Sequence, residues 1–187
     1  MKTSSKIPAP GSRKDLIART ALLQFADKGY EHVSTQQLAR EAGVSEALIF
    51  KHFGTKEQLL AFVVTTGYQR VVERIRGRLA ETDPLLFVHR MIELPLVLVR
   101  EEPEFWKLQA RLADVEFARR QHARFLQPLP PLLEQAFGKL GYAQPAAEAQ
   151  LLLLLVDAVW KGLATNPSEQ LPELLDFIKT KYQPQPA

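Results

Sequence analysis

Between residues 36 and 47, four side chains have types that can contact the edges of DNA bases. Gln36 can form a bidentate hydrogen-bonded pair with adenine, Glu46 can accept from N4 of cytosine, and Ala47 can touch the thymine methyl group. Ser45 adds a hydroxyl that can donate or accept. Such contacts select a base sequence only when a rigid element presents them together, so the structure of this segment decides what they can do.

Side chains that can bind phosphate flank this group. Ser34 and Thr35 offer hydroxyls at the start of a predicted helix, whose free N–H groups also suit a phosphate. Lys56 supplies a point charge near the start of another predicted helix. Lys51 and His52 lie at the far end of the segment, where contacts to phosphates and to base edges are both possible.

Residues 34–52 are predicted to form two short helices joined by a tight turn. Ser34 or Thr35 can cap the first helix, Gly43 permits the turn, and Ser45 can cap the second helix. The apolar residues that can bury one face of this pair are Leu38, Ala39, Ala42, Val44, Leu48, Ile49 and Phe53. This is the helix-turn-helix pattern, whose second helix enters the DNA major groove. The alternative is a helical hairpin without a role in DNA binding.

The segment resembles the DNA-binding head of the tetracycline-repressor-like (TetR-type) family of bacterial transcription regulators. The matching residues are Thr35, Leu38, Ala39, Ala42, Gly43, Val44, Ser45, Ile49, Phe50, Phe53, Lys56 and Leu59. The run from Arg19 to Tyr30 also resembles the first helix of that family, so the detailed resemblance covers about residues 12–62. The remaining chain is similar only in length and helical character.

The resemblance implies which side chains face DNA, namely Thr35, Gln36, Glu46, Ala47, Phe50, His52 and Lys56. Two positions depart from the family pattern. Phe50 stands where the family usually has tyrosine, so a hydroxyl contact to phosphate is absent. Leu48 stands where a small hydroxyl residue is common, which puts apolar surface in place of a polar group. Both departures concern phosphate binding, and the helix-turn-helix motif itself is intact.

The composition is that of an ordinary globular protein, with 46% hydrophobic and 24% charged residues in a chain of 187. The chain contains no cysteine, which excludes a disulfide framework and a thiolate metal site. Its most apolar run, residues 151–156, is far too short to span a bilayer, and residues 1–11 lack the apolar region of a secretory signal. We therefore expect no membrane partner, and a location in the bacterial cytoplasm, associated with the nucleoid.

Positive charge is concentrated near the helix-turn-helix pattern. Residues 1–56 contain nine Lys and Arg against five Asp and Glu, whereas residues 57–187 contain fifteen against sixteen. A basic head on a near-neutral body is typical of a DNA-binding protein, although a solvated basic surface gives the same count.

The whole chain is predicted to be all-α with about nine helices, because prolines mark helix starts and no alternating stretch indicates a strand. The predicted helices are 12–28, 34–42, 45–52, 55–80, 84–100, 104–126, 129–140, 145–165 and 168–182. We divide the chain into a flexible tail (1–11), a three-helix helix-turn-helix head (12–54) and a helical body (55–187). The resemblance implies that the body binds a ligand and dimerises.

A ligand site is expected around Pro95, which should kink its helix and open space between neighbouring helices. The candidate ligand-binding residues are Phe87, His89, Met91, Pro95, Trp106, Gln109, Ala113 and Phe117, with Asp114 and His122 as further polar candidates. Aromatic residues and Met at helical spacing fit an ordinary core equally well. His89 and Glu93 share a helix face, but two ligands do not make a metal site, so no metal, cofactor or catalytic residue is expected.

The last two helices are suited to a dimer interface. The helix at 145–165 is apolar nearly all round, so it must be buried on more than one side, and Asp157 and Lys161 can pair on its remaining polar side. The candidate interface residues are Leu151, Leu155, Val159, Trp160, Leu163, Leu174, Phe177 and Ile178. Two helices from each of two copies would form a four-helix interface about a twofold axis. A monomer that buries these residues in its own core is the alternative.

These features together favour a ligand-responsive, homodimeric regulator of transcription. We expect a repressor that binds a palindromic double-stranded DNA operator and is released by a small, hydrophobic effector. One alternative is a DNA-binding protein without ligand control, which would have a solidly packed body. The other is an enzyme built on the helical body, against which stand the missing Ser-His-Asp signature and phosphate-binding loop.

Overall fold

The computed structural model describes residues 11–165 and 171–185, and these residues form helices joined by turns, with no β-strand among them. The α-helices are α1 (Arg13–Lys28), α2 (Thr35–Glu41), α3 (Glu46–Phe53), α4 (Lys56–Leu79), α5 (Pro84–Glu101), α6 (Pro103–Arg111), α7 (Glu116–Leu126), α8 (Leu129–Lys139), α9 (Pro145–Thr165) and α10 (Leu171–Lys181). A short 3-10 helix, η1 (Tyr30–His32), follows α1. The all-α prediction is confirmed. The predicted flexible tail lies outside the described residues, apart from Gly11.

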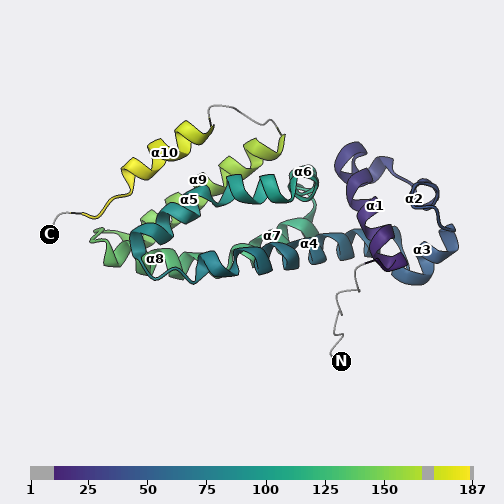
Figure 1. Ribbon diagram of the computed structural model, residues 1–187, viewed down its shortest axis with the longest axis horizontal. Helices are drawn as coiled ribbons and strands as arrows, with labels where there is room; N and C mark the ends of the chain where they lie inside the picture. Colours follow the sequence, from purple (N-terminus) through teal and green to yellow (C-terminus); the bar gives the residue numbers. More distant parts are fainter. Residues whose placement is uncertain (1–10, 166–170, 186–187) are drawn as a thin grey trace, which may run out of the picture.

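The helices are arranged as a head and a body. Figure 1 shows α1, α2 and α3 gathered at one end of an elongated molecule, with α5, α7, α8, α9 and α10 toward the other end. α4 leaves the head and runs along the body, where α7 packs against it. In the body, α9 packs against α5, α6 and α8.

The single helix expected at 104–126 is divided into α6 and α7 by a turn at residues 112–115. Within this turn the backbone N–H of Val115 donates to the carbonyl of Leu112 at 2.9 Å. Asp114 and the β-branched Val115 are weak helix formers, so a break here costs little. The break lets α6 pack against α1 and α9 while α7 packs against α4.

Side-chain caps fix where the helices of the head begin. The hydroxyl of Ser34 accepts from the backbone N–H of Gln37 at 3.1 Å, and that of Ser45 accepts from Leu48 at 3.3 Å. Such a cap stabilises a helix by about 1 kcal/mol. Between the two helices, Gly43 has φ 62°, a conformation that is costly for a residue with a side chain. The predicted turn geometry is confirmed.

The core of the head is continuous with that of the body. Ile17 and Phe25 of α1, Ile49 of α3 and Phe105 of α6 are fully buried in one apolar cluster. At Gly67 of α4 the backbone lies against the Phe105 ring so closely that an added Cβ would overlap the ring. This contact holds α4 and α6 together where the head meets the body.

Candidate nucleic-acid interface and small-molecule cavity

The base-edge candidates lie on the surface of the head, on α2 and at the start of α3. Gln36, Ser45 and Ala47 are exposed, and Glu46 is half-buried. One carboxylate oxygen of Glu46 accepts a hydrogen bond from the hydroxyl of Thr35. This bond ties the two helices together, and among the described residues it leaves the other oxygen free to accept from a base. It was not evident from the sequence, where the partners are eleven positions apart.

The phosphate-binding candidates are also on the surface of the head. Ser34 and Lys51 are exposed, and His52 and Lys56 are half-buried. Phe50 of α3 is 45% exposed. None of the ten candidate DNA-contacting residues is therefore packed inside the described part of the molecule, and their contact with DNA stays a prediction.

Tyr30 positions Lys56, a role that was missed in the sequence. The Lys56 Nζ atom lies 4.2 Å from the centre of the Tyr30 ring, a cation–π contact. The Tyr30 hydroxyl donates to Glu57 Oε1 at 3.3 Å. Burial, together with the Glu57 charge, raises the pKa of Tyr30 to about 12, so this hydroxyl stays a donor. The lysine ammonium is thus held at the start of α4 rather than extended freely into solvent.

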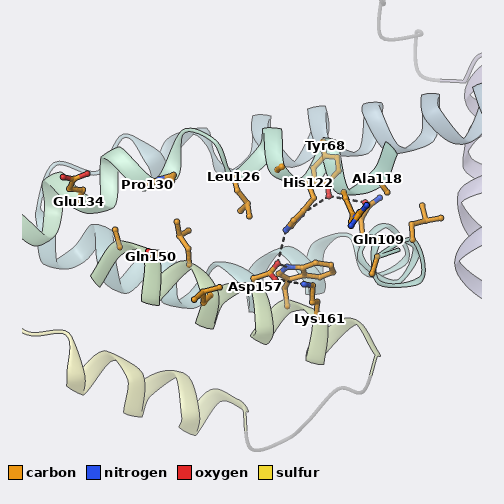
Figure 2. A pocket seen from close by; sticks show the side chains of 18 of the residues that line it. Tyr68, Gln109, Ala118, His122, Leu126, Pro130, Glu134, Gln150, Asp157 and Lys161 are labelled. Carbon is orange, nitrogen blue, oxygen red and sulfur yellow. Dashed lines mark hydrogen bonds and ion pairs between the residues drawn. The ribbon is translucent and has the colours of Figure 1, made fainter. Parts of the chain in front are cut away.

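The body contains a cavity of about 650 Å³ lined by residues of α4, α6, α7, α8 and α9. Figure 2 shows Tyr68, Gln109 and His122 at one end of it, with Glu134 and Gln150 toward the other. Apolar residues dominate the wall between these ends, among them Leu126, Leu153, Leu154 and Ala149. This volume falls within the range of small-molecule sites, which combine apolar walls with a few aimed polar groups.

A chain of hydrogen bonds crosses the polar end of the cavity. The Tyr68 hydroxyl lies 3.2 Å from Gln109 Oε1 and 3.0 Å from His122 Nδ1, and His122 Nε2 lies 3.1 Å from Asp157 Oδ1. Asp157 also accepts from Trp160 Nε1 at 2.8 Å and from Lys161 Nζ at 2.6 Å. The chain therefore joins four helices, α4, α6, α7 and α9, around one side of the space.

Charge and burial act on the two acidic groups of this chain in opposite directions. The hydrogen bond from His122, with those from Lys161 and Trp160, holds the pKa of the Asp157 carboxyl well below its ordinary range. Burial raises the pKa of Tyr68, and the Asp157 charge raises it further. Asp157 is therefore an anion and Tyr68 a neutral hydroxyl near neutral pH.

Two of the eight predicted ligand-binding residues, Gln109 and Ala113, line this cavity. The other six are placed elsewhere: Phe87, Met91, Pro95 and Trp106 are buried, Phe117 packs against the core, and His89 Nε2 lies 3.1 Å from the Tyr182 carbonyl. α5 continues through Pro95, which lines none of the described cavities. No described cavity is therefore centred on Pro95, because these large apolar side chains fill the core, and a ligand site at Pro95 stays an untested prediction.

The residues predicted for dimerisation are brought together, with one exception. Seven of the eight line an apolar groove of about 730 Å³ between α9 and α10, and the exception, Trp160, lines the cavity in the body. Within the groove Leu151 is 49% exposed and Phe177 55% exposed. Although α9 is strongly apolar, none of the described helices meets the length and hydropathy that crossing a membrane requires.

The head and the cavity are in contact through α6. On one side α6 packs against α1, where Arg111 Nη2 donates to the Asp27 carbonyl at 2.9 Å and Lys107 Nζ lies 3.7 Å from Asp27 Oδ1. On the other side α6 contributes Gln109 to the cavity. A change in the position of α6 on ligand binding would therefore directly alter its contacts with α1 of the head.

The fold and this site define a helix-turn-helix protein with a ligand-sized cavity in its helical body. Residues 17–63 match the family described as bacterial regulatory proteins, tetR family. The chain is 27% identical to the HTH-type transcriptional repressor AcnR of Corynebacterium efficiens, over 93% of this chain and 94% of AcnR. Residues 17–63 therefore form a DNA-binding domain of the tetR family, in a chain that is similar over nearly its whole length to a transcriptional repressor.

Solved structures share the fold. AibR in complex with isovaleryl coenzyme A and operator DNA has a TM-score of 0.72 and 21% identity, over 92% of this chain and 99% of AibR. A putative transcriptional regulator of Saccharomonospora viridis in complex with choline has a TM-score of 0.70 and 21% identity, over 92% of this chain and 98% of that chain.

Proposed function

We propose that this protein is a homodimeric repressor that binds a palindromic operator and is released from it by a small, largely hydrophobic molecule. The observation that carries the proposal is the cavity of about 650 Å³ whose wall includes α6, the helix that also packs against the head. AcnR is described as a repressor, and AibR was solved with both a ligand and operator DNA. A body with such a cavity disfavours a DNA-binding protein without ligand control.

In the DNA-bound state, the two α3 helices of a dimer lie in successive major grooves. Their centres must be about 34–36 Å apart to match one turn of DNA. An effector in the cavity stabilises a position of α6 and α4 that changes this spacing. It releases DNA only to the extent that its affinities for the two states differ.

We propose that α9 and α10 pair with the same helices of a second copy. The exposed apolar side chains Leu151, Leu174 and Phe177 line one groove between these two helices. A groove of this kind is unfavourable in water and becomes stabilising when a second copy covers it. We also propose that the protein acts in the bacterial cytoplasm, where operator DNA is found.

The proposal is tested by letting the purified protein select its own operator from a library of fragmented genomic DNA. Affinity for the selected fragment is then measured with and without candidate effectors of increasing apolar size. We expect a palindromic site, binding of one dimer per site, and at least one compound that weakens binding more than tenfold. Selection of no site at low ionic strength would refute DNA binding, and affinity that no cavity-binding compound changes would refute ligand control.

A further inference from the structure

Gln109 is the buried polar side chain of the cavity that lacks a full set of partners. Only 4% of the residue is exposed, and its Nε2 atom has no hydrogen-bond partner among the described residues. Its Oε1 atom accepts from Tyr68, so the two N–H groups of the amide are the ones left over. Buried N–H groups without a partner are unfavourable, which makes this amide a place where a ligand acceptor gains a full hydrogen bond.

The protonation of His122 follows from the same hydrogen bonds. The Tyr68 hydroxyl has one proton, and if it donates to Gln109 Oε1, then His122 Nδ1 must donate to the Tyr68 oxygen. His122 Nε2 faces a carboxylate that can only accept, so it also carries a proton. Both ring nitrogens are then donors, which is the imidazolium form of histidine.

Loss of the proton on His122 Nδ1 reverses the direction of the hydrogen bonds that join His122, Tyr68 and Gln109. With neutral His122, the Tyr68 hydroxyl donates to Nδ1, and its oxygen can accept from Gln109 only if the amide turns over. The Gln109 oxygen, rather than its nitrogen, is then the atom without a partner. The charge on His122 therefore sets whether Gln109 offers the cavity a donor or an acceptor.

The groups around His122 include one carboxylate and several aromatic rings. α9 contributes the Asp157 carboxylate at 3.1 Å, with Lys161 on the far side of that carboxylate. α4 contributes the neutral Tyr68 hydroxyl, and Arg119 of α7 lines the same cavity but is paired with Glu116. The remaining neighbours are rings, those of Trp106, Phe125 and Trp160. Asp157 is thus the nearest charged group to His122, and its carboxylate can only accept from Nε2.

We propose that the effector presents a carbonyl or carboxylate oxygen, at the end of an apolar chain, to Gln109 Nε2, and that its binding keeps His122 protonated. The apolar chain lies along Leu126 and Leu153, away from the polar end. The proposal rests on the proposed function in that it takes this cavity as the effector site. Gln109 is then the residue that sets specificity, and His122 is a positioning residue that acts through Tyr68.

Three probes with alkyl chains of similar length distinguish a ligand that offers an acceptor from one that offers only donors: octanoate, methyl octanoate and octylammonium. Their affinities for the full-length protein are measured by calorimetry near neutral pH. We expect octanoate and methyl octanoate to bind at least tenfold more tightly than octylammonium, since the latter carries donors only. Equal binding of all three, or tighter binding of octylammonium, would overturn the proposal. A preference for octanoate over its ester would identify the acceptor as a carboxylate, and the reverse as a carbonyl.

Two substitutions assign the preference to Gln109. In Gln109→Leu, octanoate affinity should fall about tenfold with octylammonium unchanged. In Gln109→Glu, the preference should reverse in favour of octylammonium, because a carboxylate offers acceptors in place of donors. Gln69→Leu is the matched control, since Gln69 also has a buried unpartnered amide atom but does not line this cavity. If both Gln109 variants keep the wild-type preference, Gln109 is not the contact.

Proton linkage is measured by repeating the octanoate titration above pH 7 in buffers that differ in ionisation enthalpy. We expect proton uptake on binding in the wild type, and none in His122→Asn. Binding without proton uptake in the wild type would refute the role of His122. DNA release is measured separately: Gln109-dependent binding of octanoate that leaves operator affinity unchanged would refute the proposed function but not this inference.

Discussion

Each α-helix of the head begins with a serine hydroxyl that accepts a backbone hydrogen bond. Of the helices that line the cavity, α4 begins with a threonine cap, whereas α6, α7 and α8 begin without a side-chain cap among the described residues. The head also has a filled core, while the body contains a cavity of about 650 Å³. The region whose shape must match DNA is thus fixed locally. The region that must respond to a ligand carries fewer local constraints, and such regions open at lower free energy.

The difference between head and body should be largest when one apolar side chain in each region is truncated to alanine. Ile49→Ala in the head core should lower the free energy of unfolding by about 2–5 kcal/mol, because Ile49 is fully buried. Leu153→Ala in the cavity wall should cost about 1 kcal/mol, since a side chain beside a void has fewer neighbours to lose. Denaturant unfolding of both variants checks this. Equal losses would mean that the cavity wall is packed as tightly as the head.

Within the head, substitutions should distinguish residues that contact bases from residues that contact phosphates. Gln36→Ala should change base preference at one operator position by about 1–3 kcal/mol if its contact is bidentate. Lys56→Ala should weaken all sequences about equally and lower the slope of log affinity against log salt by about one. Binding to operator variants at several salt concentrations separates these effects. Unchanged base preference in Gln36→Ala and Glu46→Ala would remove direct readout by these residues.

Loss of a helix cap should lower the local stability of the head toward that of the body. Ser45→Ala removes the hydroxyl that accepts from Leu48, which should cost about 1 kcal/mol and fray the start of α3. In the wild type, amide hydrogens of α6 and α7 should exchange faster than those of α2 and α3. In Ser45→Ala this difference should shrink. Equal exchange in the two regions of the wild type would show that the missing caps have no effect on local stability.

The pH dependence of stability tests the contribution of one charged group in the body, Asp157. Because the pKa of Asp157 is lowered in the folded state, its contribution is present above the ordinary pKa of about 3.9 and is lost as the pH falls below it. Asp157→Asn should therefore be less stable than the wild type at neutral pH, and the difference should shrink toward pH 3. A difference that stays constant over this range would show that the charge of Asp157 does not stabilise the fold.

The helix-turn-helix could be predicted because its signals are local. Ser34, Gly43 and Ser45 each act on residues no more than a few positions away, and their predicted roles match the observed caps and turn. The division of the predicted helix at 104–126 was missed because its cause is tertiary: α6 packs mainly against α1 and α9, and α7 against α4.

The cavity could be predicted only in part, because its polar chain joins distant positions. Tyr68 contacts Gln109 and His122 across 41 and 54 residues, and no local pattern marks such pairs. Trp160 lies on a helix that is apolar nearly all round, so the sequence did not show that it faces the cavity while Leu151 faces outward. The Asp157–Lys161 pair, four positions apart on one helix, was predicted and is present at 2.6 Å.

The chain has no cysteine, so one substitution gives a single labelling site in each copy. Glu41→Cys, at the exposed end of α2, carries a spin label beside the DNA-reading helix without replacing a predicted DNA contact. The distance between the two labels of a dimer, measured by pulsed electron resonance on selected operator DNA and then with saturating octanoate, tests the central claim most directly. We predict one narrow distance on DNA that shifts and broadens when octanoate binds. A distance that octanoate leaves unchanged, or the absence of any dipolar signal from a second copy, would contradict it.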